Sequence, residues 1–112
     1  MARSTNAHTS CLTEPRYLIL LSLAAGPRHG YGIIKSVHAL GNSKVRLTTG
    51  TLYGGLRELT EMGWLEIVPA DANPRSKRLT KAYGLTPAGH EALIQQIARM
   101  RWLIDAAAEQ GL

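Results

Sequence analysis

The sequence predicts a mainly α-helical fold with one small β-hairpin, and three observations support that prediction. Apolar residues recur at helical spacing in three segments before Gly63. After Gly63 the pattern changes to the alternation typical of strands, and helical spacing returns from Pro87 almost to the end of the chain. Three helices, a two-stranded wing and a last helix follow one another in the order of a winged helix-turn-helix protein.

The first two helices have clear start and stop signals. Thr13 and Pro15 predict a helix start, because a threonine oxygen caps free amides and proline fits the first turn. A strongly apolar segment follows, and Gly26-Pro27 ends it. We expect the second helix from about His29 to Leu40, and Gly41-Asn42 closes it.

The third helix, which ends near Met62-Gly63, separates its apolar and polar sides within residues 47–59. Three leucines fall on the side that faces a core: Leu52, Leu56 and Leu59. Tyr53, Gly54 and Arg57 project on the other side. This outward face is small, hydroxyl-bearing and basic, which suggests a nucleic-acid reader.

A hairpin follows the third helix. Trp64–Val68 and Leu79–Leu85 are the strand candidates, and Asp71–Pro74 has the composition of a turn. Three cations lie at the expected hairpin tip: Arg75, Lys77 and Arg78. These long side chains could track phosphates or enter a minor groove, and a solvated run of charge is the alternative.

The last helix is expected to start at Thr86-Pro87 and to reach about Glu109. Four apolar residues form a narrow seam along it: Leu93, Ile97, Met100 and Ile104. Trp102 lies on roughly the opposite side. Because one seam is enough to cover the core of a monomer, apolar positions on two sides predict a partner helix and hence a homodimer.

Length and charge narrow the organisation. With 112 residues the chain holds one domain and an appendage. We expect a flexible N-terminal segment at residues 1–11, a winged-helix DNA-binding domain at 12–86 and a dimerisation helix at 87–112. The net charge of +5 and the isoelectric point near 9.8 favour an acidic partner such as nucleic acid or an anionic membrane surface.

Other classes of protein find little support. Cys11 is the only cysteine, and the four histidines are scattered without a metal-binding or catalytic motif. The longest apolar stretch, Tyr17–Ala25, is far shorter than the ~20 residues that cross a bilayer. The chain start lacks the apolar block of a secretory signal. We expect a cytoplasmic protein that is not an enzyme and has no cofactor, no metal and no membrane partner.

The start of the third helix suits the major groove of B-DNA, which is about 12 Å wide. Thr49 and Thr51 supply short hydroxyls, and Gly50 leaves backbone amides open at the positive end of the helix dipole. Tyr53 can donate a hydrogen bond, and Arg57 can reach a phosphate or a guanine. Two alternatives stay open: Thr49 merely caps the helix, and Tyr53 packs against the wing.

Two further features concern the same surface. Gly54 and Gly55 each cost about 1 kcal/mol relative to alanine inside a helix, so either their missing side chains serve a purpose or the helix tolerates the strain. We interpret Gly54 as clearance for the DNA backbone and Gly55 as packing against another helix. His29 and Tyr31, at the start of the second helix, are additional candidates for backbone contact, although burial is the alternative for Tyr31.

Three motifs carry a family resemblance. They are Pro27-Arg28-His29-Gly30-Tyr31-Gly32-Ile33, then Thr49-Gly50-Thr51-Leu52-Tyr53 with Gly63-Trp64-Leu65, then Tyr83-Gly84-Leu85-Thr86-Pro87-Ala88-Gly89. In this order and spacing they resemble the PadR family of transcriptional regulators over roughly residues 12–93. The chain departs from the family at Gly54-Gly55, where members often carry proline or alanine, and its wing has fewer aromatic residues than usual.

The resemblance implies a homodimer that binds double-stranded operator DNA with two-fold symmetry, usually as a repressor, and often releases it when a small effector binds. It also implies that Trp102 could stack a flat aromatic effector, with simple interface packing as the alternative. Two other functions remain in competition, because the same scaffold serves several. They are a winged-helix protein-interaction module and a non-specific architectural DNA binder.

Overall fold

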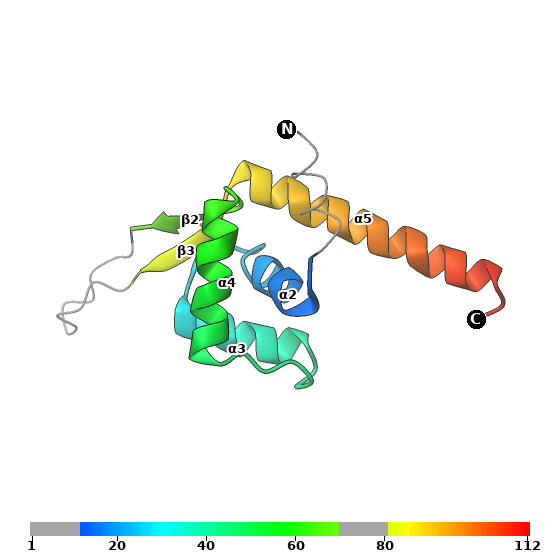
Figure 1. Ribbon diagram of the computed structural model, residues 1–112, viewed down its shortest axis with the longest axis horizontal. Coiled ribbons are helices and arrows are strands. Elements are labelled where there is room, and N and C mark those ends of the chain that lie inside the picture. Colours follow the sequence, from blue (N-terminus) through cyan, green and yellow to red (C-terminus); the bar gives the residue numbers. More distant parts are fainter. Residues whose placement is uncertain (1–11, 70–80) are drawn as a thin grey trace.

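The computed structural model describes residues 12–69 and 81–112. Figure 1 shows a small sheet packed among short helices, with a long helix running past them. The elements in chain order are α2 (Glu14–Ser22), β1 (Arg28–His29), α3 (Gly30–Leu40), α4 (Thr49–Glu61), β2 (Leu65–Val68), β3 (Ala82–Leu85) and α5 (Pro87–Glu109). The four helices of these residues and the wing strands β2 and β3 confirm the predicted order.

Threonine side chains cap three of the helices. The Oγ1 atom of Thr13 accepts a hydrogen bond from the Arg16 amide, and Thr86 caps α5 in the same way. Thr48, rather than Thr49, caps α4, since its Oγ1 accepts from the Thr51 amide at 3.1 Å. The capping alternative for Thr49 is therefore wrong, because that residue already belongs to the first helical turn.

The sheet has a third strand that the sequence did not predict. Its order is β1-β3-β2, and both pairings are antiparallel. His29 does not begin α3 but lies in β1, where its extended backbone pairs with Ala82. A strand of two residues leaves no periodic signal in a sequence, so only the pairing with β3 reveals it. The predicted two-stranded wing is thus anchored to the segment before α3.

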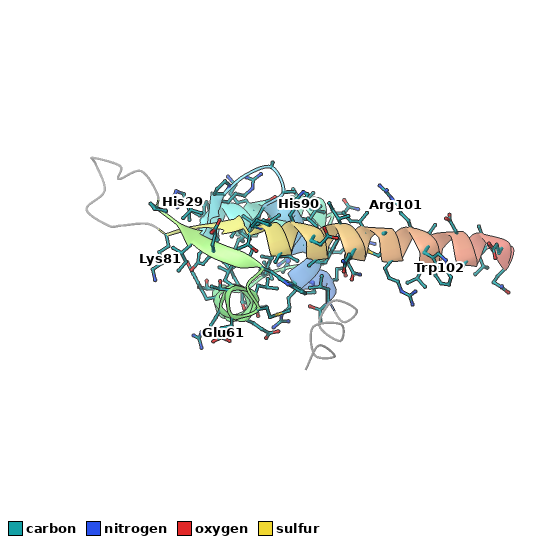
Figure 2. All side chains as sticks on the ribbon, turned by 90° about the horizontal axis from the view of Figure 1, so that it is seen from above. His29, Glu61, Lys81, His90, Arg101 and Trp102 are labelled. Carbon is teal, nitrogen blue, oxygen red and sulfur yellow. The ribbon has the colours of Figure 1, made fainter. Side chains whose placement is uncertain are left out.

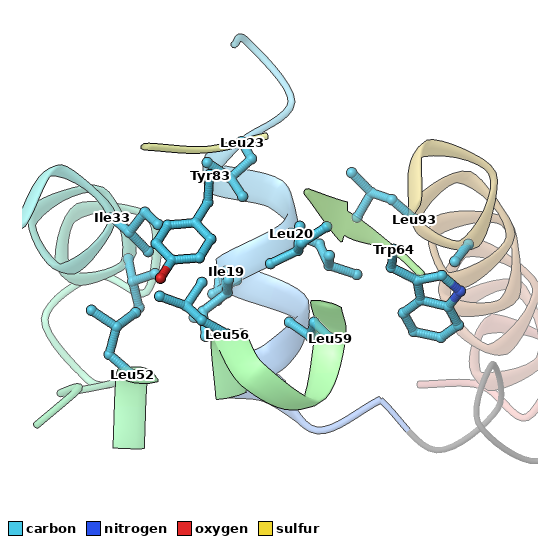
Figure 3. Close-up of a cluster of buried hydrophobic side chains, with 14 residues drawn as sticks. Ile19, Leu20, Leu23, Ile33, Leu52, Leu56, Leu59, Trp64, Tyr83 and Leu93 are labelled. Carbon is cyan, nitrogen blue, oxygen red and sulfur yellow. The ribbon is translucent and has the colours of Figure 1, made fainter. Parts of the chain in front are cut away.

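The core lies between α2, α3, α4, the sheet and the start of α5 (Figure 3). Leu52, Leu56 and Leu59 are at most 1% exposed, which confirms the predicted inward face of α4. Gly55 is buried against α2, where an added Cβ would lie 3.3 Å from Ile19 Cδ1, so packing explains this glycine as expected. The aromatic residues Trp64 and Tyr83 belong to the same cluster, with Trp64 near Leu93 and Tyr83 near Ile33 (Figure 3).

The helix α5 has two parts. Its first turns pack on the domain, with Ala92 and Leu93 buried in the same core. Its last turns extend beyond the other elements (Figures 1 and 2). One end of α5 therefore belongs to the fold and the other is exposed to solvent.

In residues 12–69 and 81–112, none of the helices is long and apolar enough to span a membrane.

Candidate nucleic-acid interface

The outward face of α4 presents the side chains that the sequence predicted. Thr49, Gly50, Thr51, Tyr53 and Arg57 are all exposed, while the opposite face of the helix is buried. The Thr51 hydroxyl is 2.9 Å from the Thr48 hydroxyl, so one of the two candidate hydroxyls already has a partner at the cap. The helix start thus offers short polar groups and open backbone amides near its positive dipole end.

Tyr53 combines exposure with support from below. It is 47% exposed, and its hydroxyl lies against Gly30 at the start of α3. The ring also borders a hollow of about 340 Å³ between α4 and the wing strands, whose other polar walls come from Arg57, Thr60, Glu61, Lys81 and Tyr83. The packed end of Tyr53 therefore lies against α3 rather than the wing, and the rest of the ring borders the hollow and faces out.

The floor of this hollow is a buried phenol. Tyr83 is 8% exposed, and burial, with a smaller contribution from Tyr53, raises the pKa of its hydroxyl above the usual 10.0. Tyr83 therefore stays neutral at physiological pH. The charges of the hollow come from the side chains around its rim.

His29 lies in β1, beside the base of the wing, and Tyr31 lies in the first turn of α3. The Nδ1 atom of His29 lies 3.3 Å from the Lys81 carbonyl oxygen, so this side chain joins β1 to the base of the wing (Figure 2). Tyr31 is 73% exposed, which overturns the alternative that it is buried. Both residues are on the surface and can reach a ligand.

The predicted cations of the wing tip, Arg75, Lys77 and Arg78, lie outside the described residues. Lys81, at the base of the wing, is exposed and borders the hollow beside Arg57. Lys81 follows the three predicted tip cations in the sequence and was not among the predicted contact residues. The position of Lys81 follows from the pairing of β3 with β1, which no local sequence pattern predicted.

Charge is segregated along the chain in a way that reinforces this surface. No acidic residue occurs from residue 15 to residue 57, a span that contains Arg28, Lys35, Arg46 and Arg57. Acidic residues resume at Glu58, which forms an ion pair with Arg16 of α2 at 2.8 Å. The segment from α3 to Arg57 therefore carries a net positive charge. Short runs of neighbouring cations, on which the sequence prediction rested, do not reveal this long acid-free span.

The predicted seam of α5 divides into two environments. Leu93 is 3% exposed and packs inside its own chain, so its assignment to a dimer interface is wrong. Ile97 packs on the margin of the core, and Met100 borders a hollow between α2 and α5. Ile104 is 68% exposed beyond them. The stripe therefore serves the core at one end and is uncovered at the other.

Trp102 lies on the projecting part of α5 and is 62% exposed (Figure 2). The guanidinium carbon of Arg99, one turn earlier, lies 5.2 Å from the centre of the indole ring. This distance suits a cation–π contact.

No group of three or more metal-binding side chains occurs among the residues that the structure describes.

A known protein family has the same sequence features. A model described as the transcriptional regulator PadR-like family matches residues 19–95, more than half of the chain. The chain belongs to this family. Because PadR-like proteins are transcriptional regulators, membership confirms that the chain is a regulator rather than an enzyme. A search of curated proteins found no match.

Crystal structures of PadR-like proteins share the fold. A PadR family transcription regulator from hypervirulent Clostridium difficile R20291 has a TM-score of 0.71 at 22% identity, covering 87% of this chain and 97% of that one. A PadR-like transcription factor from Bacteroides fragilis has a TM-score of 0.71 at 22% identity, covering 97% and 98%. Bacillus subtilis PadR in complex with operator DNA has a TM-score of 0.63 at 24% identity, covering 73% and 45%. These likenesses confirm the winged-helix prediction.

Proposed function

We propose that this chain is a homodimeric, sequence-specific DNA-binding repressor that acts in the cytoplasm. The exposed face of α4, with Tyr53 and Arg57 beside the small residues 49–51, would enter the major groove of a two-fold operator. The observation that carries the proposal is the combination of a fully buried leucine face and an uncovered basic face on one helix. The operator complex of Bacillus subtilis PadR supports it by likeness of fold.

A dimer supplies the symmetry that a two-fold operator needs. Ile104 and Leu103 are 68% and 46% exposed on the projecting end of α5, an unfavourable place for large apolar side chains in a monomer. A hollow of about 500 Å³ between α2 and α5, with Tyr17, Leu21 and Met100 in its wall, offers a second apolar surface. We infer that a second copy covers these surfaces.

Selection of bound fragments from a random duplex library tests the DNA proposal. We expect enrichment of one motif with two-fold symmetry and an affinity that falls steeply with salt. Uniform binding without an enriched motif would instead identify an architectural DNA binder, and absence of duplex binding would favour a protein-interaction module. Arg57→Ala should reduce affinity for the selected duplex, whereas Arg101→Ala, an equal change of charge on α5, should leave it nearly unchanged.

We also propose that Trp102 stacks a flat aromatic effector and that its binding releases the DNA. The support is a ring that is 62% exposed next to Arg99 on the projecting end of α5. A Trp64→Phe background removes the other tryptophan, so titration with a flat tricyclic compound can be followed by Trp102 fluorescence alone. Saturable quenching together with loss of duplex binding supports the proposal, and quenching without DNA release contradicts it.

A further inference from the structure

A second basic hollow lies at the turn between α3 and α4, apart from the recognition surface described above. Its volume is about 450 Å³, and its walls are Tyr31, Ile34, Lys35, His38, Arg46 and Leu47. We call it the α3–α4 hollow. Arg46 and Leu47 come from the turn immediately before α4, and the others come from α3.

The charged side chains that line the α3–α4 hollow are both positive. Lys35 and Arg46 are exposed, and neither makes an ion pair with any residue in the described part of the chain. The acid-free span of residues 15–57 encloses the whole hollow, so no carboxylate neighbours it in sequence. The Lys35 ammonium lies 5.6 Å from the centre of the Tyr31 ring, which holds this long side chain beside an exposed hydroxyl.

The turn that carries Arg46 is held in a fixed shape. Asn42 and Ser43 have positive φ angles of 54° and 63°, which residues with side chains adopt only when the surroundings support them. The Ser43 hydroxyl lies 3.1 Å from His38 Nε2, and the Ser43 amide donates to the His38 carbonyl at 2.9 Å. His38 therefore both borders the hollow and positions the turn.

The α3–α4 turn and the wing lie on opposite sides of α4 (Figure 1). Lys81 and Arg57 line the hollow on the wing side, and Lys35 and Arg46 line the α3–α4 hollow. A helix in the major groove lies between two phosphate backbones, so cations on both sides of it can be used at once. The wing side and the turn side would then face different strands of the duplex.

We propose that the α3–α4 hollow binds a phosphate of the duplex backbone, with Lys35 and Arg46 as the charged contacts and Tyr31 as a hydrogen-bond donor. The inference rests on the proposed DNA binding and assigns it a second anchoring point. Phosphate contacts fix the register of a reading helix but carry no base information. The hollow therefore contributes affinity and orientation equally for every sequence.

The salt dependence of binding tests this proposal. A Lys35→Ala, Arg46→Ala double variant is compared with the wild type on the selected duplex and on a mixed-sequence duplex. The slope of log affinity against log salt should fall by about 0.9 for each phosphate that the variant no longer neutralises, and affinity for both duplexes should fall by the same factor. Lys44→Ala is the matched control, because Lys44 is exposed on the same turn but does not line the hollow.

A scan with single uncharged methylphosphonates locates the contact. At one or more positions the substitution should weaken the wild type and leave the double variant unaffected. An unchanged salt slope in the double variant, or the absence of any such position, overturns the inference while leaving DNA binding intact. If the wild type binds no duplex at all, the proposed function falls with it. Weaker binding of inorganic phosphate by the double variant without any change of slope would show a small-anion site, which also overturns the assignment.

Discussion

The hydroxyl of Tyr53 on α4 occupies the space where Gly30 on α3 would carry a side chain. A Cβ atom added to Gly30 would lie 2.8 Å from Tyr53 Oη, closer than nonbonded carbon and oxygen approach. Gly30 is buried at the first turn of α3, and Tyr53 is 47% exposed on the proposed DNA face. The glycine of one helix thus determines the position of the tyrosine on the next.

Gly30→Ala should therefore separate stability from DNA binding. The atom that must move is the far end of the Tyr53 side chain, so we expect a change of less than about 1 kcal/mol in the free energy of unfolding. Displacement of Tyr53 should weaken duplex binding about threefold to tenfold, the value of one hydrogen bond. Urea unfolding and fluorescence anisotropy measure the two effects.

Gly32→Ala is the control for that experiment, since its added Cβ would lie 3.7 Å from Arg28 Cβ, an ordinary contact. It should leave duplex affinity at the wild-type value. Equal losses of affinity in the two variants would mean that Gly30 does not affect DNA binding through the position of Tyr53.

The two adjacent glycines of α4 should respond in opposite ways. An added Cβ meets nothing within 4 Å at Gly54, so Gly54→Ala should stabilise the helix by about 1 kcal/mol. At Gly55 the same atom would press on the buried Ile19, so Gly55→Ala should gain less or lose stability. If Gly54 gives clearance to DNA, only Gly54→Ala should weaken duplex binding. Wild-type affinity in that variant would remove clearance as the explanation.

The sequence predicted most of this fold because the signals are local. Threonine caps, glycine stops and leucine spacing lie within or next to each helix, and they identified α3, α5 and the end of α4 nearly to the residue. The helix α2 ends at Ser22, before the predicted stop at Gly26-Pro27. The strand β1 escaped because its two residues are extended only through pairing with β3. The exposure of the α4 face was predictable from helical periodicity. The basic hollow at Arg46 and Lys35 was not, since it depends on how the turn before α4 folds against α3.

The seam of α5 shows the same limit. Leu93, Ile97, Met100 and Ile104 follow one another at spacings of three or four residues, and a helical wheel cannot tell where the domain stops covering them. Coverage depends on the position of α2 and β3 against the first turns of α5. Leu93 was therefore assigned to a dimer interface although it completes the core of its own chain.

Gly89→Ala should be strongly destabilising. A Cβ at this position of α5 would lie 2.0 Å from the Trp64 carbonyl oxygen, and that oxygen also accepts a hydrogen bond from the Thr86 amide. Because the obstacle is backbone, neither partner can turn aside, and we expect a loss of several kcal/mol. The urea midpoint should fall at constant slope. Gly54→Ala is the matched control, and an unchanged midpoint in Gly89→Ala would contradict the close approach.

The buried phenol of Tyr83 should make stability sensitive to alkaline pH. Burial raises its pKa above that of the unfolded chain, with Tyr53 adding to the shift. The folded state thus favours the neutral form, and this contribution is fully present below pH about 10 and is lost as the pH rises through the folded pKa. The free energy of unfolding should fall in that range for the wild type and less steeply for Tyr83→Phe. Parallel curves for the two proteins would exclude Tyr83 as the cause.

Leu93 and Ile104 should separate folding from assembly, although they lie on one stripe of α5. Leu93→Ala removes a core side chain that is 3% exposed, so we expect a loss of about 2–5 kcal/mol in the free energy of unfolding. Ile104→Asp places a charge on a side chain that is 68% exposed, so the chain should keep its helical circular dichroism. Sedimentation velocity should give the mass of a dimer for the wild type and that of one chain for Ile104→Asp. A dimer of unchanged mass in that variant would mean that the projecting end of α5 is not where two copies meet.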